Sequence, residues 1–329
     1  MKKTYIMPIE LKETIDSENN IFSGSSGIKL QEKQITAKDI INMIEKNLQE
    51  IKDNNIEISF EGEYFTKLDL EKQEELLSCI MPYIKEGKIS NIIVKALPQN
   101  ITKEKLKILR KYKVKTIKME VATLSNYLLK RAKFSFTYEE IKKATKLIRK
   151  YGFYLIYKVY IGLPEATKLD EVNTAKLICK LKPKCVEIYP VEIKEKTKIA
   201  NEVENGEYEE LTMIQKIERT KEIFYMLSKK KINVEIKAYN NEEFKNRVES
   251  GIWLDTIVDK IKKYNVKVKE VEIEVNSLNF DTAIGYKNEN IEKLKDYYNV
   301  DSKVVTNDDI KPGKLEIIIK KKFTDFLEE

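Results

Sequence analysis

Apolar positions along most of the chain follow a helical spacing and a strand spacing in turn. The first helix is predicted where Ile40, Ile44 and Leu48 fall on one face. The next segment, IEISF at 56–60, alternates apolar and polar residues as a half-buried strand does. This succession of a helix and a strand then recurs, with strands expected at 91–97, 116–121, 153–161, 185–189 and 232–238. A single helix is expected over 69–86, and the pairs Thr36/Asp39, Thr137/Glu140 and Thr167/Asp170 have the spacing of helix N-caps.

Alternating helices and strands predict a parallel sheet with helical crossovers, because parallel strands cannot be joined by a short hairpin. The fold class is therefore α/β, either an open sheet or a barrel. About six units precede residue 240, fewer than the eight of a full barrel. We expect a partial (β/α)6 barrel, with its functional face at the loops that follow the carboxyl ends of the strands.

The pattern changes near Trp253. Residues 267–275 alternate as a strand, two helices meet at 284–288, and Pro312-Gly313 precedes a last strand. We therefore expect two domains, a barrel over residues 1–264 and a small α+β domain over residues 265–329.

Composition excludes several classes of enzyme. The 329 residues include no histidine, which removes Ser-His-Asp and Cys-His nucleophile systems and His-ligated zinc. Cys79, Cys179 and Cys185 are isolated, so no disulfide framework is expected. The sequence shows neither an apolar run of membrane length nor a signal peptide, which predicts a cytoplasmic protein without a membrane partner.

Charged residues lie inside several expected strands, where a helix-covered parallel sheet normally has an almost continuous apolar run. They are Glu57, Lys95, Lys118, Lys158, Glu187, Glu235 and Lys237. Their alternation indicates a polar barrel interior, in which buried charges have to pair. We hypothesise that Lys158 and Glu187 form an ion pair there. In the alternative arrangement, both side chains point towards the helices and reach water.

Short motifs in a fixed order resemble a known family. They are YIMPI at 5–9, FEGEYFT at 60–66, LP at 97–98, IGLP at 161–164, IYP at 188–190 and NGEY at 205–208. This order resembles the radical S-adenosylmethionine (SAM) proteins, in particular oxygen-independent coproporphyrinogen III oxidase and the Elongator catalytic subunit. The resemblance covers residues 4–240 and implies a partial barrel of the radical SAM type.

The family is defined by a CxxxCxxC loop after the first strand, whose thiolates hold a [4Fe–4S] cluster that binds and cleaves SAM. Carried over without gaps, the three cysteine positions fall on Asp16, Asn20 and Ser23, while the aromatic Phe22 remains. An aspartate, an amide and a hydroxyl do not replace soft thiolates as ligands of an iron–sulfur cluster. The resemblance therefore implies degenerate ligand positions, and we expect neither the cluster nor SAM as a cofactor.

Oxygen ligands at the same three positions suit Mg²⁺ or Ca²⁺, which is a second interpretation of this loop. Nothing in the spacing of the polar stretch 16–20 demands a metal cage. A solvated loop without a metal site is the favoured interpretation.

Positions that face SAM in the family depart from it as well. The glycine-rich stretch after the second strand reads GEYFT at 62–66, a later one reads EVAT at 120–123, and the glycine after IGLP is Glu165. The resemblance also implies a set of candidate residues for a SAM-pocket-like site. They are Phe22, Gly62, Glu63, Thr66, Glu120, Thr123, Lys158, Gly162, Pro164 and Glu187.

The C-terminal segment resembles a KH module, in which a GxxG loop between two helices contacts nucleic-acid phosphates. Asn288 stands at the second glycine position. The RNA-binding candidates that this resemblance implies are Gly285, Tyr286, Lys287 and Lys293. Glu289 and Glu292 lie beside the lysines and favour the alternative, a packing module without RNA.

Three functions are consistent with these observations. The favoured hypothesis is a catalytically degenerate radical SAM homologue, a pseudoenzyme that acts as a binding or regulatory protein with RNA or tRNA as a partner. The second is a cluster-free enzyme that still binds SAM or a related small molecule in the barrel. The third is a structural partner of an active paralogue.

Overall fold

The chain forms two units that are distinguished by their internal contacts. The computed structural model describes residues 4–12, 20–23, 35–51, 55–238, 241–264 and 267–322. The first unit contains residues 1–211 and 223–235, and the second contains residues 212–222 and 236–329. The domain boundary expected between residues 264 and 265 stays a prediction.

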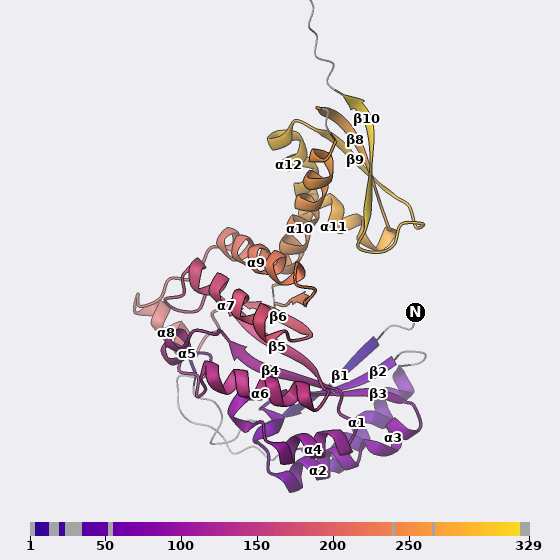
Figure 1. Ribbon diagram of the computed structural model, residues 1–329. Helices are drawn as coiled ribbons and strands as arrows, with labels where there is room; N and C mark the ends of the chain where they lie inside the picture. The colour runs from indigo at the N-terminus through magenta and orange to yellow at the C-terminus, as the bar shows by residue number, and fades with distance from the viewer. Residues whose placement is uncertain are drawn as a thin grey trace, which may run out of the picture. The chain divides into compact units, whose positions relative to one another are not determined.

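The first unit is built around a seven-stranded sheet whose strands follow one another in chain order. The strands are β1 (Thr4–Leu11), β2 (Asn55–Gly62), β3 (Ile89–Ala96), β4 (Thr116–Ala122), β5 (Tyr154–Ile161), β6 (Cys185–Pro190) and β7 (Asn233–Ile236). Strands β1 to β6 pair in parallel. The predicted α/β partial barrel is thus confirmed as a seven-stranded half-barrel (Figure 1).

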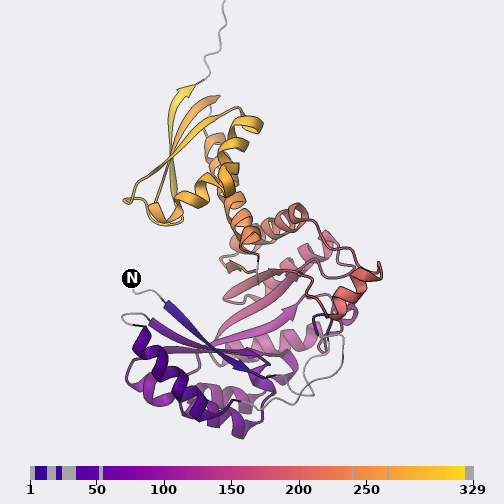
Figure 2. The ribbon, with the colours of Figure 1, turned by 180° about the vertical axis from the view of Figure 1, so that it is seen from behind.

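Helices connect the strands and lie along one face of the curved sheet (Figures 1 and 2). Those between β1 and β6 are α1 (Ala37–Glu50), α2 (Leu70–Ser78), α3 (Met81–Lys85), α4 (Lys103–Lys111), α5 (Asn126–Arg131), α6 (Tyr138–Lys150) and α7 (Lys168–Leu181). The helices α8 (Lys198–Glu204) and α9 (Met213–Ser228) follow β6 in the chain. Within the described ranges, every helix is too short or too polar to cross a lipid bilayer.

Local sequence explains where several of these helices begin. Thr36, Thr137 and Thr167 form capping boxes at the starts of α1, α6 and α7, as the sequence pattern predicts. The single helix expected over 69–86 is instead divided into α2 and α3. Pro82 lies in the first turn of α3, where its missing N–H costs nothing, whereas a continuous helix would need that N–H.

The two faces of the sheet differ in polarity. In β4, Ile117, Met119 and Val121 are fully buried and alternate with Lys118 and Glu120. The same alternation occurs in β5, where the hydroxyl of the buried Tyr157 shares a hydrogen bond with Thr145 of α6. The helix-covered face is therefore apolar and the concave face is polar, as the charged strand positions predict.

The second unit contains a small mixed sheet. Its central strand β8 (Val268–Val275) is parallel to β9 (Asp301–Thr306) and antiparallel to β10 (Leu315–Lys322). Its helices include α10 (Glu242–Lys262), α11 (Phe280–Ile284) and α12 (Glu289–Tyr298). The segment β8–α11–α12–β9 thus connects two parallel strands through a pair of short helices.

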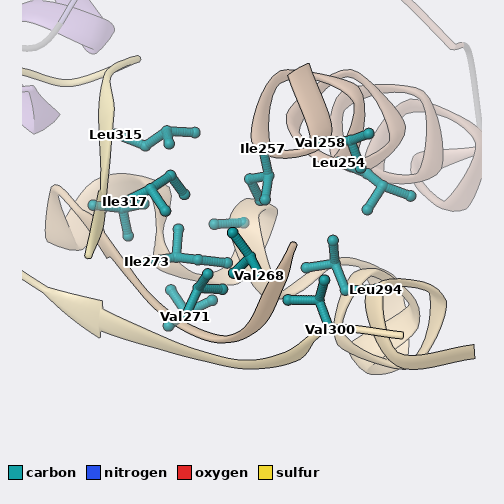
Figure 3. Close-up of a cluster of buried hydrophobic side chains, with 13 residues drawn as sticks. Leu254, Ile257, Val258, Val268, Val271, Ile273, Leu294, Val300, Leu315 and Ile317 are labelled. Carbon is teal, nitrogen blue, oxygen red and sulfur yellow. The ribbon is translucent and has the colours of Figure 1, made fainter. Parts of the chain in front are cut away.

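The core of this unit includes the C-terminal half of α10. Leu254, Ile257 and Val258 of this helix are buried with Val271 and Ile273 of β8 (Figure 3). Fully burying one such side chain stabilises a fold by about 1.5–3 kcal/mol. The packing of α10 therefore explains why the contacts group this helix with the C-terminal sheet.

Gly62 ends β2 where the backbone of β1 comes close. Its φ is +72°, and a Cβ atom built on it would collide with the carbonyl oxygen of Leu11. We predict that Gly62→Ala lowers the urea midpoint of unfolding clearly more than Gly87→Ala does. Gly87 is a matched control because its φ is +71° and nothing lies within 4 Å of a Cβ there. The control is expected to cost about 1 kcal/mol for its left-handed backbone, and equal losses in both variants would contradict the close approach.

Candidate functional site

Polar side chains from three neighbouring strands meet on the concave face. They are Lys118 and Glu120 of β4, Lys158 and Tyr160 of β5, and Glu187 and Tyr189 of β6. The strand register places Lys158 beside Glu120 on one side and beside Glu187 on the other. Glu120, Lys158, Tyr160 and Tyr189 belong to the carboxyl-terminal halves of their strands, the end at which parallel barrels carry their functional groups. Lys118 and Glu187 lie two residues further back along β4 and β6.

Two ion pairs hold this cluster together. Lys158 Nζ lies 3.5 Å from Glu120 Oε2, and Lys118 Nζ lies 3.1 Å from Glu187 Oε1. Both glutamate side chains are only 2% exposed, so each needs a cation to offset the cost of its desolvation. Lys158 and Glu187 do share this face as register partners, while an ion pair between the two of them stays a prediction.

Tyr64 completes the surroundings of Glu120. Its hydroxyl donates to Glu120 Oε2 at 3.0 Å. Burial, reinforced by the neighbouring Glu120 carboxylate, holds the pKa of Tyr64 well above its usual range. The phenol therefore stays protonated and acts as a fixed hydrogen-bond donor. The other carboxylate oxygen, Glu120 Oε1, is buried and has no hydrogen-bond partner within the described residues.

Aromatic rings surround the Lys158 ammonium. Its Nζ lies 5.1 Å from the ring centroid of Tyr160 and 5.0 Å from that of Tyr189, both within cation–π range. Phe22 stacks on Tyr160 with a centroid distance of 4.7 Å. Tyr189 also donates its hydroxyl to Glu187 Oε2 at 3.1 Å. The predicted residues Phe22, Glu120, Lys158 and Glu187 therefore lie in one cluster.

The loop that carries Phe22 is held by its backbone. Ile21 donates its N–H to the carbonyl of Ala132 at 3.1 Å and accepts from the N–H of Ile199 at 2.9 Å. Ser23 accepts from the N–H of Lys198 at 3.0 Å. The C-terminal end of α5 and the first turn of α8 thus fix this segment in the fold.

Glu165 and Arg131 form an ion-pair network beside the loop that carries Phe22. Glu165 has a left-handed backbone with φ of +64°, which explains why the resembling family has glycine at this position. Its carboxylate accepts from Arg131 Nε at 2.6 Å. The Arg131 guanidinium also forms two hydrogen bonds of 2.9 Å with Glu202 of α8. The side chain that replaces the family glycine is therefore part of an ion-pair network.

The two described positions that the resemblance aligns with cluster cysteines do not fit an iron–sulfur cluster. Asn20 is 6% exposed, and its Oδ1 accepts the N–H of Phe22 at 3.0 Å, so the amide stabilises its own loop. Ser23 offers only a hydroxyl, and Asp16 lies outside the described residues. A [4Fe–4S] cluster needs thiolates, which neither of the two described positions provides.

The three cysteines lie elsewhere and apart from one another. Cys79 caps the end of α2, Cys179 lies in α7, and Cys185 begins β6. Burial raises the pKa of the Cys79 thiol to about 11 and raises the pKa of Cys179 as well, which disfavours thiolates. In the described parts of the chain, no three acidic or cysteine side chains are grouped as metal ligands. The cysteines therefore supply no second cluster site.

The remaining pocket candidates make structural hydrogen bonds at the ends of the strands. Glu63 accepts from the N–H of Tyr64 at 2.9 Å, and Thr66 Oγ1 accepts from the N–H of Leu97 at 3.3 Å. Thr123 shares a hydrogen bond of 3.0 Å with Thr174 of α7. These three residues shape the loops beside the cluster described above.

The IGLP motif is fixed in a similar way. The N–H of Gly162 donates to Glu171 Oε1 at 2.8 Å, and its carbonyl accepts from the hydroxyl of Tyr208 at 2.7 Å. Pro164 is buried two residues further along. Glu171 and Tyr208 were not among the predicted site residues, although Tyr208 belongs to the NGEY motif.

Sequence reasoning also missed members of the concave cluster. Tyr64, Tyr160 and Tyr189 were not predicted, and Lys95 and Lys118 were expected in the polar interior of the barrel but not as site residues. For Lys118, Tyr160 and Tyr189 the available signal was the alternation of the strands, because every second residue of β4, β5 and β6 points to the same face as Glu120, Lys158 and Glu187. Tyr64 lies outside the strands, so alternation could not predict it.

The lysines among the RNA-binding candidates of the second unit differ in whether a carboxylate pairs with them. Lys287 is exposed, with its Nζ 5.1 Å from the ring centroid of Tyr286. Lys293 lies 2.8 Å from Glu289, whose carboxylate also lies 2.6 Å from Arg247. Glu289 therefore neutralises Lys293 but not Lys287.

Comparison with known proteins identifies the fold of the barrel. Residues 24–178 match the family model of the radical SAM superfamily, a match that begins directly after Ser23. Among curated proteins, none matches the sequence. Two solved structures illustrate the likeness: the archaeal Methanocaldococcus infernus Elp3, and the coproporphyrinogen III oxidase HemN from Escherichia coli, a radical SAM enzyme.

The Elp3 structure is 16% identical, covers 72% of this chain and 56% of its own, and has a TM-score of 0.55. The HemN structure is 15% identical, covers 70% and 53%, and has a TM-score of 0.51. Streptococcus suis SuiB bound to the precursor peptide SuiA is 14% identical, covers 93% and 58%, and has a TM-score of 0.55. This chain thus spans little more than half of each protein, and the likeness shows a shared fold.

The Lys118–Glu187 pair leads to a test of the cluster. We predict that Lys118→Met, which leaves Glu187 buried without this cation, lowers the free energy of unfolding by about 3 kcal/mol. The matched control is Lys111→Met, because Lys111 pairs with Glu74 at 2.9 Å on the surface. The control is expected to leave the denaturant midpoint almost unchanged. A Lys118 variant as stable as the control would show that Glu187 does not depend on this ion pair.

Proposed function

We propose that this protein, whose barrel has the fold of the radical SAM superfamily, carries no [4Fe–4S] cluster and acts as a binding or regulatory protein. One observation carries the proposal. Asn20 is turned into its own loop and Ser23 offers a hydroxyl, so the described ligand positions hold no thiolate. Radical chemistry on SAM depends on the cluster.

The concave face is the binding site in this proposal. Lys118 and Lys158 keep 19% and 15% of their side chains exposed, so water reaches the cluster. Glu120 Oε1 is a buried acceptor without a hydrogen bond inside the described chain. A ligand that donates a hydrogen bond to it would remove the cost of that unsatisfied oxygen. Tyr160 and Tyr189 add flat apolar surface beside it.

Reconstitution with iron tests the proposal directly. We predict that anaerobic treatment with iron and sulfide leaves the protein without the visible absorbance of a [4Fe–4S] cluster and without stoichiometric iron after desalting. The matched control is the triple variant Asp16→Cys, Asn20→Cys, Ser23→Cys, which restores the CxxxCxxC spacing. Stoichiometric iron in the unaltered chain would overturn the proposal, whatever the triple variant binds.

The two other hypotheses of function predict different experimental results. A cluster-free enzyme that uses SAM would release or take up heat when SAM is titrated into the metal-free protein. A structural partner of an active paralogue would be recovered together with a CxxxCxxC-bearing relative from its host. A binding protein for another ligand does neither.

RNA binding by the second unit is a second candidate function, supported by a specific observation. The segment β8–α11–α12–β9 has the strand–helix–loop–helix–strand order of a KH module. Its loop turns through left-handed backbone at Gly285, Lys287 and Asn288, with φ of +90°, +51° and +68°. At Gly285 a Cβ atom would lie 2.8 Å from the N atom of Asn290, so the loop requires glycine there.

Electrostatics beside this loop limit the RNA-binding surface. A pocket of about 450 Å³ adjoins Tyr286 and Lys287, and its lining includes Glu249 and Asp281. Burial raises the pKa of Glu249, yet both groups repel phosphate when ionised. The phosphate-binding contribution is therefore assigned to Lys287 and the exposed edge of the loop.

Binding of bulk tRNA over a salt series tests this second function. We predict that the logarithm of the affinity falls with the logarithm of the salt concentration, and that Lys287→Glu reduces the slope by about 1. Lys293→Glu is the matched control and should change binding less, because Glu289 already neutralises Lys293. Absence of binding at low salt would make the second unit a packing module.

A further inference from the structure

Lys95 is a lysine of the concave face that differs from its neighbours. It lies one residue before the end of β3, and the strand register places it beside Lys118 of β4. Its side chain is half-buried. Groups at this position of a parallel barrel face the site formed by the loops after the strands.

The partners of Lys95 leave its charge without direct compensation. Its Nζ donates to the carbonyl of Gly62 at 2.7 Å and lies 5.3 Å from the ring centroid of Tyr64. Within the described residues, no carboxylate lies within 4.0 Å of it, whereas Lys118 and Lys158 each have a glutamate partner. Lys95 is thus held in place by a neutral carbonyl and an aromatic ring.

The surroundings of Lys95 make its charged form less favourable than that of an exposed lysine. Burial, and then the positive charge of Lys158, lower the pKa of Lys95. Glu120, Glu61 and Glu10 act in the opposite direction, but the pKa stays below its usual value. A neutral lysine amine is a nucleophile, and desolvation beside another cation is a known way to produce one.

A carboxyl group that acts electrostatically on this amine lies on the adjacent strand β4. Glu120 of the adjacent strand uses Oε2 to bind Tyr64 and Lys158, while its Oε1 is buried without a hydrogen bond in the described chain. A carboxyl group placed in this way can deliver a proton to a carbonyl oxygen and take one from a nitrogen.

We propose that Lys95 is a reactive amine that forms a Schiff base with a small aldehyde or ketone bound on the concave face. The amine nitrogen bonds to the carbonyl carbon while the C=O double bond opens, and Glu120 relays protons between nitrogen and oxygen. Both amine protons leave with the carbonyl oxygen as one molecule of water, which leaves a C=N bond to Lys95. No oxidant or reductant is consumed.

The charges of the site indicate which carbonyl compounds suit it. Lys95, Lys118 and Lys158 bring three ammonium groups to this face, and Lys95 has no carboxylate within 4.0 Å among the described residues, although Glu120, Glu61 and Glu10 act on it from further away. A carbonyl compound with an anionic group would relieve the repulsion between Lys95 and Lys158 that the pKa of Lys95 reflects. The ligand class is therefore a small oxo acid, and glyoxylate is the probe with these properties.

Reductive trapping tests the proposal on the unaltered protein. Incubation with glyoxylate and cyanoborohydride, followed by proteolysis and mass spectrometry, is expected to modify Lys95 about 100-fold faster than the exposed Lys107, the lower end of a general acid–base contribution. Propanal, which is uncharged, should modify Lys95 less selectively. Equal rates at Lys95 and Lys107 would overturn the proposal.

Two variants separate this chemistry from simple accessibility. Lys158→Met removes the positive neighbour and should move the pH profile of Lys95 labelling to higher pH, with Lys107 unchanged as the internal control. An unchanged profile in the folded variant contradicts the assignment. Lys95→Arg should abolish labelling at residue 95 while keeping its charge. The assay needs no iron, so cluster assembly in the reconstitution experiment would overturn the proposed function alone.

Discussion

Two buried carboxylates on the concave face are the constraint on which the barrel depends. Glu120 and Glu187 are strongly destabilising unless cations and hydrogen-bond donors compensate them. Lys158 and Lys118 supply the charge, and two tyrosine hydroxyls donate hydrogen bonds. These groups come from different strands, so they meet only in the register that the sheet adopts. The polar interior therefore selects one alignment of β4, β5 and β6, which the apolar helix-covered face alone would specify less sharply.

Most of the barrel could be predicted from its sequence because its signals are local. Alternation within strands and threonine caps such as Thr137 depend on residues a few positions apart. The break between α2 and α3 was missed because the apolar pattern continues through it while Pro82 restarts the helix. The expected count of about six units left out β1, and the short helices α5 and α8 have too few residues to give a clear period.

The candidate site was predictable only in part. Alternation placed Lys158 and Glu187 on one face, but it gave no indication of the ion pair that Glu187 forms with Lys118, two strands away. That contact depends on the curvature of the sheet and on side-chain length, which no spacing in the sequence encodes. The role of Asn20 as a support for its own loop was equally hidden, since an amide at a former ligand position is also what a solvated loop would contain. Tyr64 was found only from its contact with Glu120, which joins residues 56 positions apart.

Gly62 limits which mutations this sequence can accept. The absence of a side chain at this position lets the end of β1 approach β2, and its carbonyl oxygen holds the Lys95 ammonium. Position 62 therefore has to satisfy two separate requirements. One is set by the fold and the other by the orientation of an amine. A neighbouring position can accept a mutation by repacking its side chain, whereas position 62 has none to repack. Mutational tolerance should be lowest here, even in descendants that abandon every ligand of the barrel.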